Sequence, residues 1–457
     1  MAANVATVDQ IELDKLPPGP RSPKWLQSLR YTRSPISHWE RLRATFGDFG
    51  TGRFNAYGEV VWLSSPDDIR EVLLADPTLV HAGEAVRFLE PILGSRSMLI
   101  LDEQEHLRKR KLLLPAFHGD ALAALEPIVQ DAADSAVEQW PVGREFALMP
   151  HMKELSLEVI LRTVFGLNEP TEFERVRAVI ADLVSSFHLV IWGSWRRRNL
   201  GAGSAWALFE RRKSAADDAV HQMIASRRRE PRISERPDVL SRMLSAQREN
   251  EEILSDIELR DDLMTLLIAG HETTSVALTW AIGLLARHPE VMERLRAERL
   301  AGGDSYLQAV IKECLRLRPI VPFTGRTLTA PMIVRGRRLP PGTKLWIPIL
   351  LVHVLPERYP QPHAFRPERF LESSPDPYTW LPFGGGIRRC IGAGLANLEM
   401  KAVIGTVANS VRLQRITAPL ERERANGVTL VPRRGGRIVV DSIQSKRGGR
   451  VKHEGFH

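Results

Sequence analysis

Residues 383–392 read FGGGIRRCIG and precede a run of helical character over residues 395–411. Three consecutive glycines permit a tight turn and let the backbone approach a flat ligand closely. Cys390 follows this turn where the next helix begins, and the N–H groups and dipole of a helix start favour a thiolate over a thiol. A thiolate beside cationic side chains is a soft ligand suited to iron. Gly392 carries no side chain that would collide with a large planar group at the sulfur.

The spacing Phe-x-x-Gly-x-Arg-x-Cys-x-Gly resembles the haem-binding loop of the cytochrome P-450 family, the haem-thiolate monooxygenases. The resemblance implies a b-type haem with Cys390 as axial thiolate, Phe383 against the macrocycle and Arg388 near a propionate. A glycine-rich turn around a buried structural cysteine is the alternative. The cofactor-binding positions implied in this loop are Phe383, Gly384, Arg388, Cys390 and Gly392.

Length and composition favour one large, mostly helical unit. The chain has 457 residues, of which 43% are hydrophobic and 26% charged, and no Gly/Ser linker or repeat divides it. The fold class we expect is mainly α with small β-sheets. The resemblance implies the cytochrome P-450 fold, a triangular helix-rich prism with haem between a long central helix and the helix after the cysteine. Its limits would be residues 16–441, with a flexible extension at 1–15 and a disordered basic tail at 442–457.

The cysteine content and the net charge indicate the cellular compartment and the class of partner. Cys314 and Cys390 are the two cysteines, which argues against a disulfide scaffold and for a reducing cytoplasm. Residues 1–16 hold no apolar core for a signal peptide or transmembrane segment, as in soluble bacterial-type members. The net charge of +8 invites a nucleic-acid interpretation, but the basic residues are scattered. An acidic protein partner explains them at least as well, and we expect no nucleic-acid partner.

A long buried helix is expected over residues 255–287. Ser255 and Glu258 match a capping box at its start. The helix is apolar around most of its circumference, but residues 270–274 interrupt it with a charge, which argues against a membrane span.

This interruption is the second informative motif. Ala269 and Gly270 are small, so a bulky group can press against the helix there. Thr273 can donate a hydrogen bond to the carbonyl of Ala269, which loosens the helix and leaves a groove for dioxygen and water. The residues resemble the family's oxygen-activating motif, Ala-Gly-x-(Asp/Glu)-Thr-Thr. The resemblance implies that Thr273 assists oxygen activation and that Glu272 relays protons. A capped kink in a core helix is the alternative.

Further arginines and a histidine are candidates for binding haem propionates. His106 and Arg110 are four residues apart, so they share a helical face and can clamp a carboxylate. They resemble the family's His-x-x-x-Arg element, and a solvated charged face is the alternative. Arg326, at the start of a strand expected over residues 326–329, matches a family position that contacts a propionate. Residues 82–98 lack clear periodicity, and residues 94–97 are expected as loop. By the same resemblance, this segment lies over the haem and shapes the substrate pocket.

A buried charged trio is expected to support this scaffold. Glu313 and Arg316 are three residues apart and can pair on one helical face, and Arg369 can complete the set. They match the family's Glu-x-x-Arg and Pro-Glu-Arg-Phe elements, and we interpret them as structural. Cys314 is most simply a packing residue.

Several other elements are predicted from local pattern. We expect helices over residues 36–46, 67–74 and 306–317, a hairpin over 49–63 around Gly58, and a strand pair over 335–346. Residues 187–198 combine tryptophans with arginines. They suit a peripheral membrane contact, a substrate entrance or a packed corner equally well.

The implied reaction inserts one atom of dioxygen into an apolar organic substrate, by hydroxylation or epoxidation. No fused dinucleotide-binding motif appears, so we expect a separate ferredoxin with an NAD(P)H-dependent reductase, or a flavodoxin. Arg388 and Arg389 would suit docking of an acidic electron carrier. A monomer is expected. The alternatives are a haem-thiolate peroxygenase or isomerase, a non-enzymatic haem sensor or carrier, and, more remotely, a basic nucleic-acid-binding protein.

Overall fold

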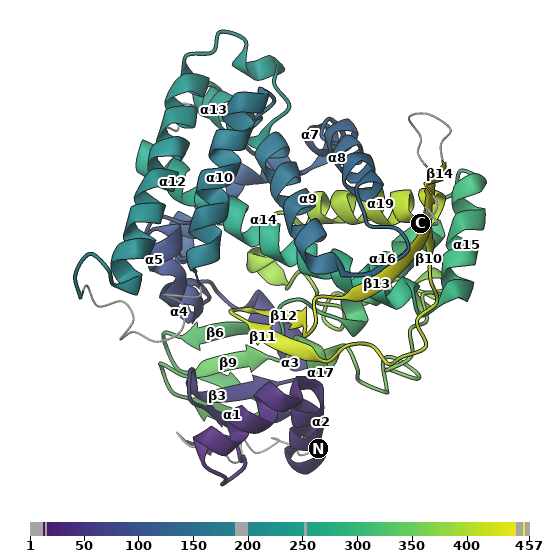
Figure 1. Ribbon diagram of the computed structural model, residues 1–457. Coiled ribbons are helices and arrows are strands. Elements are labelled where there is room, and N and C mark those ends of the chain that lie inside the picture. Colours follow the sequence, from purple (N-terminus) through teal and green to yellow (C-terminus); the bar gives the residue numbers. More distant parts are fainter. Residues whose placement is uncertain (1–11, 14–15, 188–199, 251–253, 445–450, 453–457) are drawn as a thin grey trace, which may run out of the picture. The chain divides into compact units, whose positions relative to one another are not determined.

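The computed structural model describes residues 12–13, 16–187, 200–250, 254–444 and 451–452 (Figure 1). The chain divides into two compact units that are interleaved in sequence. The first unit takes its residues from Met1–Arg87, Pro322–His363 and Pro375–Arg389, and the second from Phe88–Val321, Ala364–Ser374 and Cys390–His457. The single haem domain expected over residues 16–441 stays a prediction.

A five-stranded sheet forms the framework of the first unit. Its strand order is β2 (Phe49–Phe54), β3 (Gly58–Leu63), β9 (Lys344–Ile347), β6 (Thr324–Leu328) and β4 (Val80–His81). The β2–β3 pair is the predicted hairpin around Gly58, whose φ of +77° suits glycine. The strand expected from Arg326 begins two residues earlier, at Thr324. The helices of this unit are α1 (Lys24–Arg33), α2 (Pro35–Phe46), α3 (Pro66–Leu74), α4 (Gly83–Val86) and α17 (Ile349–Val352).

The smaller sheet of the first unit corrects two predictions. It pairs β1 (Glu12–Leu13), β8 (Arg337–Leu339) and β7 (Met332–Val334). The strand pair expected over residues 335–346 is wrong, because β8 pairs with β7 while β9 belongs to the larger sheet. Arg335 and Gly336 have φ of 50° and 73°, the conformation of a two-residue hairpin turn, so β8 folds back onto β7. Flexibility of residues 1–15 is likewise wrong for Glu12–Leu13, which pair with β8.

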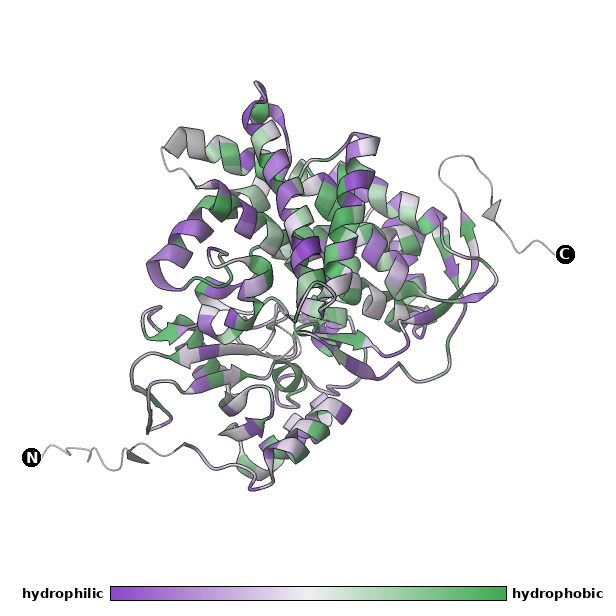
Figure 2. Cartoon of the chain, turned by 60° about the vertical axis from the view of Figure 1, so that its left-hand side comes forward, coloured by the Kyte–Doolittle hydropathy of each residue, from purple (hydrophilic) through white to green (hydrophobic). Residues whose placement is uncertain are grey.

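The second unit is mostly helical, as predicted. Its helix α14 (Asp256–Leu285) contacts α9 (Leu148–Thr163), α12 (Ala205–Arg228), α16 (Ser305–Leu317) and α19 (Ala393–Ser410). The other helices are α5 (Glu90–Leu93), α6 (Glu103–Leu113), α7 (Gly119–Ala123), α8 (Glu126–Glu138), α10 (Pro170–Ser186), α13 (Val239–Asn250), α15 (Pro289–Leu300) and α18 (Arg369–Glu372). The segment 82–98, expected to lack clear periodicity, includes the short helices α4 and α5, and its residues 94–97, expected as loop, lie outside helices and strands. Most helices carry hydrophobic and hydrophilic residues on the same ribbon (Figure 2), as amphipathic helices do.

Short strands complete the second unit. One sheet joins β10 (Val411–Leu413), β13 (Arg437–Gln444) and β14 (Val451–Lys452), and β5 (Glu145–Ala147) pairs with β13. A separate hairpin joins β11 (Glu423–Asn426) to β12 (Thr429–Pro432). Disorder of the tail 442–457 is therefore wrong for residues 442–444, which continue β13, and for β14, which pairs with β13.

Helix α14 begins as the sequence predicts. Ser255 Oγ accepts a hydrogen bond from the backbone N–H of Glu258 at 3.2 Å, and the Glu258 carboxylate accepts one from the Ser255 N–H at 3.0 Å. Of the described helices, none alone has the length and apolar composition of a membrane span. One bent pair, Glu103–Phe117 with Gly119–Glu138, meets those criteria only when its two parts are taken together.

Candidate functional site

The glycines before Cys390 form the predicted tight turn within the first unit. Gly384 and Gly386 have φ of 65° and 63°, a conformation that favours glycine. A side chain at Gly386 would also collide with the carbonyl oxygen of Leu73 in α3. The turn ends in the short 3₁₀ helix η5 (Gly386–Arg388), which carries Arg388. These two glycines are thus explained by the backbone itself.

Cys390 belongs to the second unit and lies three residues before Ala393, the first residue of α19. Its side chain is exposed, whereas Cys314 is buried, and burial raises the pKa of the Cys314 thiol. Gly392 has a φ of −83°, which any residue adopts, and an added Cβ would meet no described atom within 4 Å. Neither backbone conformation nor packing therefore requires glycine at 392. Open space beside an accessible cysteine at a helix start fits a large planar group that contains iron, such as haem.

The motif at residues 269–274 of α14 lies where the middle of this helix is partly exposed. Residues 259–267 and 274–285 of the helix are buried, but Ala269 is exposed and Gly270 and Thr273 are partly exposed. The Thr273 hydroxyl donates to the carbonyl oxygen of Ala269 at 2.6 Å, so the predicted hydrogen bond is confirmed. Gly270 has an additional explanation, because its Cβ would lie 2.5 Å from Ile160 Cδ1 of α9. Packing against α9 is thus a second reason for a small residue at this position.

Glu272 has two partners that the sequence did not reveal. Its Oε1 accepts hydrogen bonds from the Asn426 side-chain amide and, at 3.3 Å, from the Thr429 hydroxyl. Both donors flank the turn of the β11–β12 hairpin. The Asn-Gly pair at residues 426–427 could have predicted that hairpin, but no sequence pattern places it beside α14.

His106 and Arg110 lie on α6, as predicted, where His106 is buried and Arg110 is half-buried. Lys109, which lies between them, was not predicted to matter. It is fully buried, and its ammonium donates to Asp262 Oδ2 of α14 at 2.9 Å and to the carbonyl oxygen of Arg96. Lys109 therefore connects α6, the helix that carries the candidate propionate-binding residues His106 and Arg110, to α14.

The charged trio is assembled as predicted. Glu313 accepts from Arg316 at 2.7 and 2.8 Å and from Arg369 at 3.2 Å, and all three side chains are buried. The backbone N–H of Arg366 also donates to Glu313, at 2.8 Å. In the first unit, Arg326 is buried on β6 and donates to the carbonyl oxygen of Gly325 at 2.8 Å. The segment 187–198 lies, apart from Phe187, outside the described residues.

A buried acid on α19 was not predicted. Glu399 is 1% exposed, and burial raises its pKa from an ordinary 4.5 to about 8, although a hydrogen bond with Ser156 of α9 opposes that rise. Ser156 in turn donates to the carbonyl oxygen of Gly270 at 3.5 Å. Glu399 thus links the helix after Cys390 to α9, and the Ser156 hydroxyl links α9 to α14.

Replacing Glu399 by glutamine is expected to flatten the pH dependence of stability. The native state keeps the Glu399 proton up to about pH 8, whereas the unfolded chain loses it near pH 4.5. The free energy of unfolding of the unmodified protein therefore falls as pH rises through this window, by about 4–5 kcal/mol at most. Urea unfolding between about pH 5 and pH 9 should show this slope reduced in Glu399→Gln but not in Glu210→Gln, an exposed control. Equal slopes in all three proteins would contradict the assignment.

Comparisons with a family model, with curated sequences and with solved structures all match the same protein family. The family model described as Cytochrome P450 matches residues 17–437. A Mycobacterium tuberculosis protein named cytochrome P450 137, a name that leaves its reaction open, is 40% identical over 87% of this chain and 84% of its own. A Mycobacterium bovis protein named cytochrome P450 135B1 is 38% identical over 93% of this chain and 91% of its own. The solved structure of retinoic acid-bound cyanobacterial CYP120A1 matches with a TM-score of 0.80 at 24% identity, over 94% of this chain and 99% of its own.

The chain belongs to the cytochrome P450 family and has its fold. It is therefore an oxygenase-type oxidoreductase of the haem-thiolate class. Membership implies haem bound through a cysteine thiolate, dioxygen as a substrate, and a redox partner that delivers electrons. Among the described residues, no group of three or more His, Cys, Asp or Glu side chains could hold a metal ion directly.

Proposed function

We propose that this protein inserts one atom of dioxygen into an apolar organic substrate, by hydroxylation or epoxidation, with haem b bound through Cys390. The observation that carries the proposal is the exposed Cys390 at the start of α19, beside a glycine that neither packing nor backbone requires. The buried Cys314 is no competing ligand, because burial disfavours its thiolate.

In this proposal the remaining candidates hold the haem or support its binding residues. Phe383 would contact the macrocycle, with Gly384 giving close approach of the backbone. His106, Arg110, Arg388 and Arg326 would neutralise the propionates. Ala269 would face the ligand side of α14, since it is the exposed residue of that helix segment. Glu313, Arg316 and Arg369 would stabilise the scaffold without contacting substrate.

Haem, when bound, supplies the oxidation chemistry, and the chain contributes orientation and proton transfer. The Glu272 carboxylate is held through Oε1 by Asn426 and Thr429. Among the described residues, no hydrogen bond reaches Oε2, so this oxygen is available to carry a proton. The Thr273 hydroxyl donates to Ala269, which leaves its oxygen lone pairs facing away from that carbonyl. A donor–acceptor hydroxyl next in sequence to a carboxylate would be suited to passing protons toward the exposed face of α14.

Replacing Thr273 by alanine is expected to uncouple oxygen reduction from product formation. Loss of the hydroxyl removes an assigned proton-transfer group, so product formed per electron pair should fall about tenfold or more while peroxide rises. Oxygen consumption, peroxide and product would be measured together. Thr273→Ser, which keeps the hydroxyl, is the matched control and should remain coupled. Unchanged coupling in Thr273→Ala would remove the proposed role.

Electrons would come from a separate ferredoxin with an NAD(P)H-dependent reductase, or from a flavodoxin. Arg388 and the exposed Arg389 offer positive charge to an acidic carrier. We further propose that the protein is cytoplasmic and monomeric.

The test of the proposed function is spectral titration of the haem protein against a library of apolar compounds, followed by turnover with those that shift its absorption. Fatty acids, terpenoids, steroids and polyketides would be included. Retinoic acid is a suitable first compound, because CYP120A1 was solved with it bound. Substrate-dependent oxygen consumption with an oxygenated product supports the proposal. A protein that binds haem and these compounds but consumes no oxygen would contradict it.

A further inference from the structure

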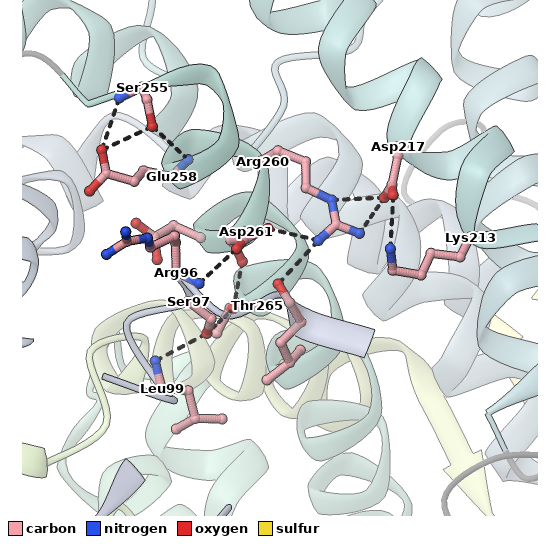
Figure 3. Close-up of polar contacts among 12 residues, drawn as sticks. Arg96, Ser97, Leu99, Lys213, Asp217, Ser255, Glu258, Arg260, Asp261 and Thr265 are labelled. Carbon is pink, nitrogen blue, oxygen red and sulfur yellow. Dashed lines mark hydrogen bonds and ion pairs between the residues drawn. The ribbon is translucent and has the colours of Figure 1, made fainter. Parts of the chain in front are cut away.

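Two adjacent carboxylates on α14 hold the backbone of a neighbouring segment. Asp261 Oδ2 accepts a hydrogen bond from the Arg96 N–H at 2.9 Å, and Asp262 Oδ1 accepts one from the Met98 N–H at 2.8 Å. Between these two amides, the Ser97 hydroxyl lies 2.7 Å from the Thr265 hydroxyl. We call residues 93–99 the wall segment, and Asp261, Asp262 and Thr265 the clasp. Figure 3 shows Asp261 and Thr265 with Arg96 and Ser97 of the wall segment.

The contacts of the clasp are buried and specific. Asp261, Asp262, Thr265 and Ser97 are between 0 and 6% exposed. Gly94 has a φ of 93°, and a side chain there would collide with the Asp261 carboxylate. Buried hydrogen bonds from backbone N–H groups to a carboxylate are costly to break, because each broken bond leaves an unsatisfied charge or amide behind. The wall segment is therefore fixed to α14 by polar contacts rather than by apolar packing alone.

Arg260 extends the network to α12. Its guanidinium donates to the Leu93 carbonyl oxygen at 3.2 Å, to Asp261 Oδ1 at 2.8 Å and to Asp217 Oδ1 at 2.7 Å (Figure 3). Asp217 also accepts from Lys213 of the same helix. Arg260 thus orients Asp261, while Asp217 touches none of the wall segment.

The wall segment borders the exposed part of α14. Thr265 and Ala269 are four residues apart, so they share a face of the helix. Ser97 contacts Thr265, and its hydroxyl accepts the N–H of Leu99, which is 36% exposed. The wall segment therefore lies about one helical turn from Ala269 and about two turns from Thr273.

We propose that Asp261, Asp262 and Thr265 are positioning residues for ligand specificity, which hold the wall segment in place before a ligand binds. The proposal rests on the proposed function, because it assigns the exposed face of α14 to the ligand side of the haem. If the wall segment is already ordered, the binding free energy of a bulky ligand that contacts it does not include the entropic cost of ordering the segment. A small ligand that reaches only the iron gains nothing from that order.

The test combines amide hydrogen exchange with two haem ligands of different size. In the haem protein carrying Asp261→Ala and Thr265→Ala, exchange in peptides covering residues 93–99 should accelerate about tenfold or more. The affinity for 4-phenylimidazole, read from the haem absorption, should fall at least about fivefold, while that for imidazole stays within about twofold. Gly94→Ala perturbs the same contact from the wall segment and should act in the same direction.

Asp217→Asn is the matched control, since it breaks the ion pair between Asp217 of α12 and Arg260 of α14, and Asp217 itself contacts none of residues 93–99. Both readouts should match the unmodified protein. If exchange is unchanged in the clasp variants, or accelerates without altering the ratio of the two affinities, the specificity role is overturned. An unmodified protein without a haem spectrum would instead overturn the proposed function, and exchange would still report whether the clasp holds the segment.

Discussion

Replacing Cys390 by alanine is expected to abolish the red-shifted absorption of the reduced, carbon monoxide-treated protein, and with it turnover. A cysteine thiolate donates electron density to haem iron, and this donation both shifts the absorption and favours cleavage of the O–O bond. Cys390 is the exposed cysteine and lies three residues before the first residue of α19. Its removal should therefore eliminate the sulfur signature completely rather than weaken it. The measurement is the difference spectrum of the reduced protein with and without carbon monoxide.

Cys314→Ala is the control that the chain itself offers. Cys314 is buried in α16 and its thiol pKa is raised by burial, so its replacement should leave the spectrum unchanged. Cys390→Ser tests the sulfur more finely, because it keeps the size and polarity of the side chain but offers an oxygen. An identical red-shifted band in Cys390→Ala would show that the iron ligand lies elsewhere, and the proposed site would fall with it.

Local sequence pattern predicted the elements around the site well. The capping box at Ser255, the hydrogen bond from Thr273 to Ala269 and the pairing of Glu313 with Arg316 are each confirmed. Each depends on residues three or four apart on one helix, where helical geometry alone determines which side chains meet. The contact of Arg369 with Glu313, 56 residues away, was also predicted and is confirmed, but only because the family resemblance supplied it.

Contacts between elements distant in sequence were missed for a physical reason. Glu272 accepts hydrogen bonds from Asn426 and Thr429, and Lys109 forms an ion pair with Asp262. In each case the two residues are more than a hundred positions apart in the sequence. Residue hydropathy does not predict such pairs. A lysine or aspartate that is buried with a partner has the same hydropathy as one on the surface. The predicted contact of Gly270 with a ligand stays a prediction, and the structure adds Ile160 of α9 beside it, since a small residue serves helix packing as readily as binding.

Replacing Glu313 by alanine is expected to lower the free energy of unfolding by about 3–5 kcal/mol. The substitution leaves Arg316 and Arg369 without the buried carboxylate that both guanidinium groups share. The side chains of Glu313 and Arg316 are fully buried and that of Arg369 is 7% exposed, so water does not readily replace the lost charge. The backbone N–H of Arg366 also loses its acceptor. Urea unfolding of the variant against the unmodified protein measures the loss.

Glu59→Ala provides the matched comparison, because Glu59 pairs with Arg53 at 2.9 Å but both side chains are more than 40% exposed. Such surface pairs contribute about 0–1 kcal/mol, so this variant should unfold almost as the unmodified protein does. Combining Glu313→Leu with Arg316→Met and Arg369→Leu removes the whole trio, and buried ion groups replaced by apolar residues of similar size often retain stability. Recovery in this triple variant would show that the loss in Glu313→Ala comes from uncompensated charge. A loss below about 1 kcal/mol in Glu313→Ala would mean that the two arginines reach water, contrary to their burial in the structure.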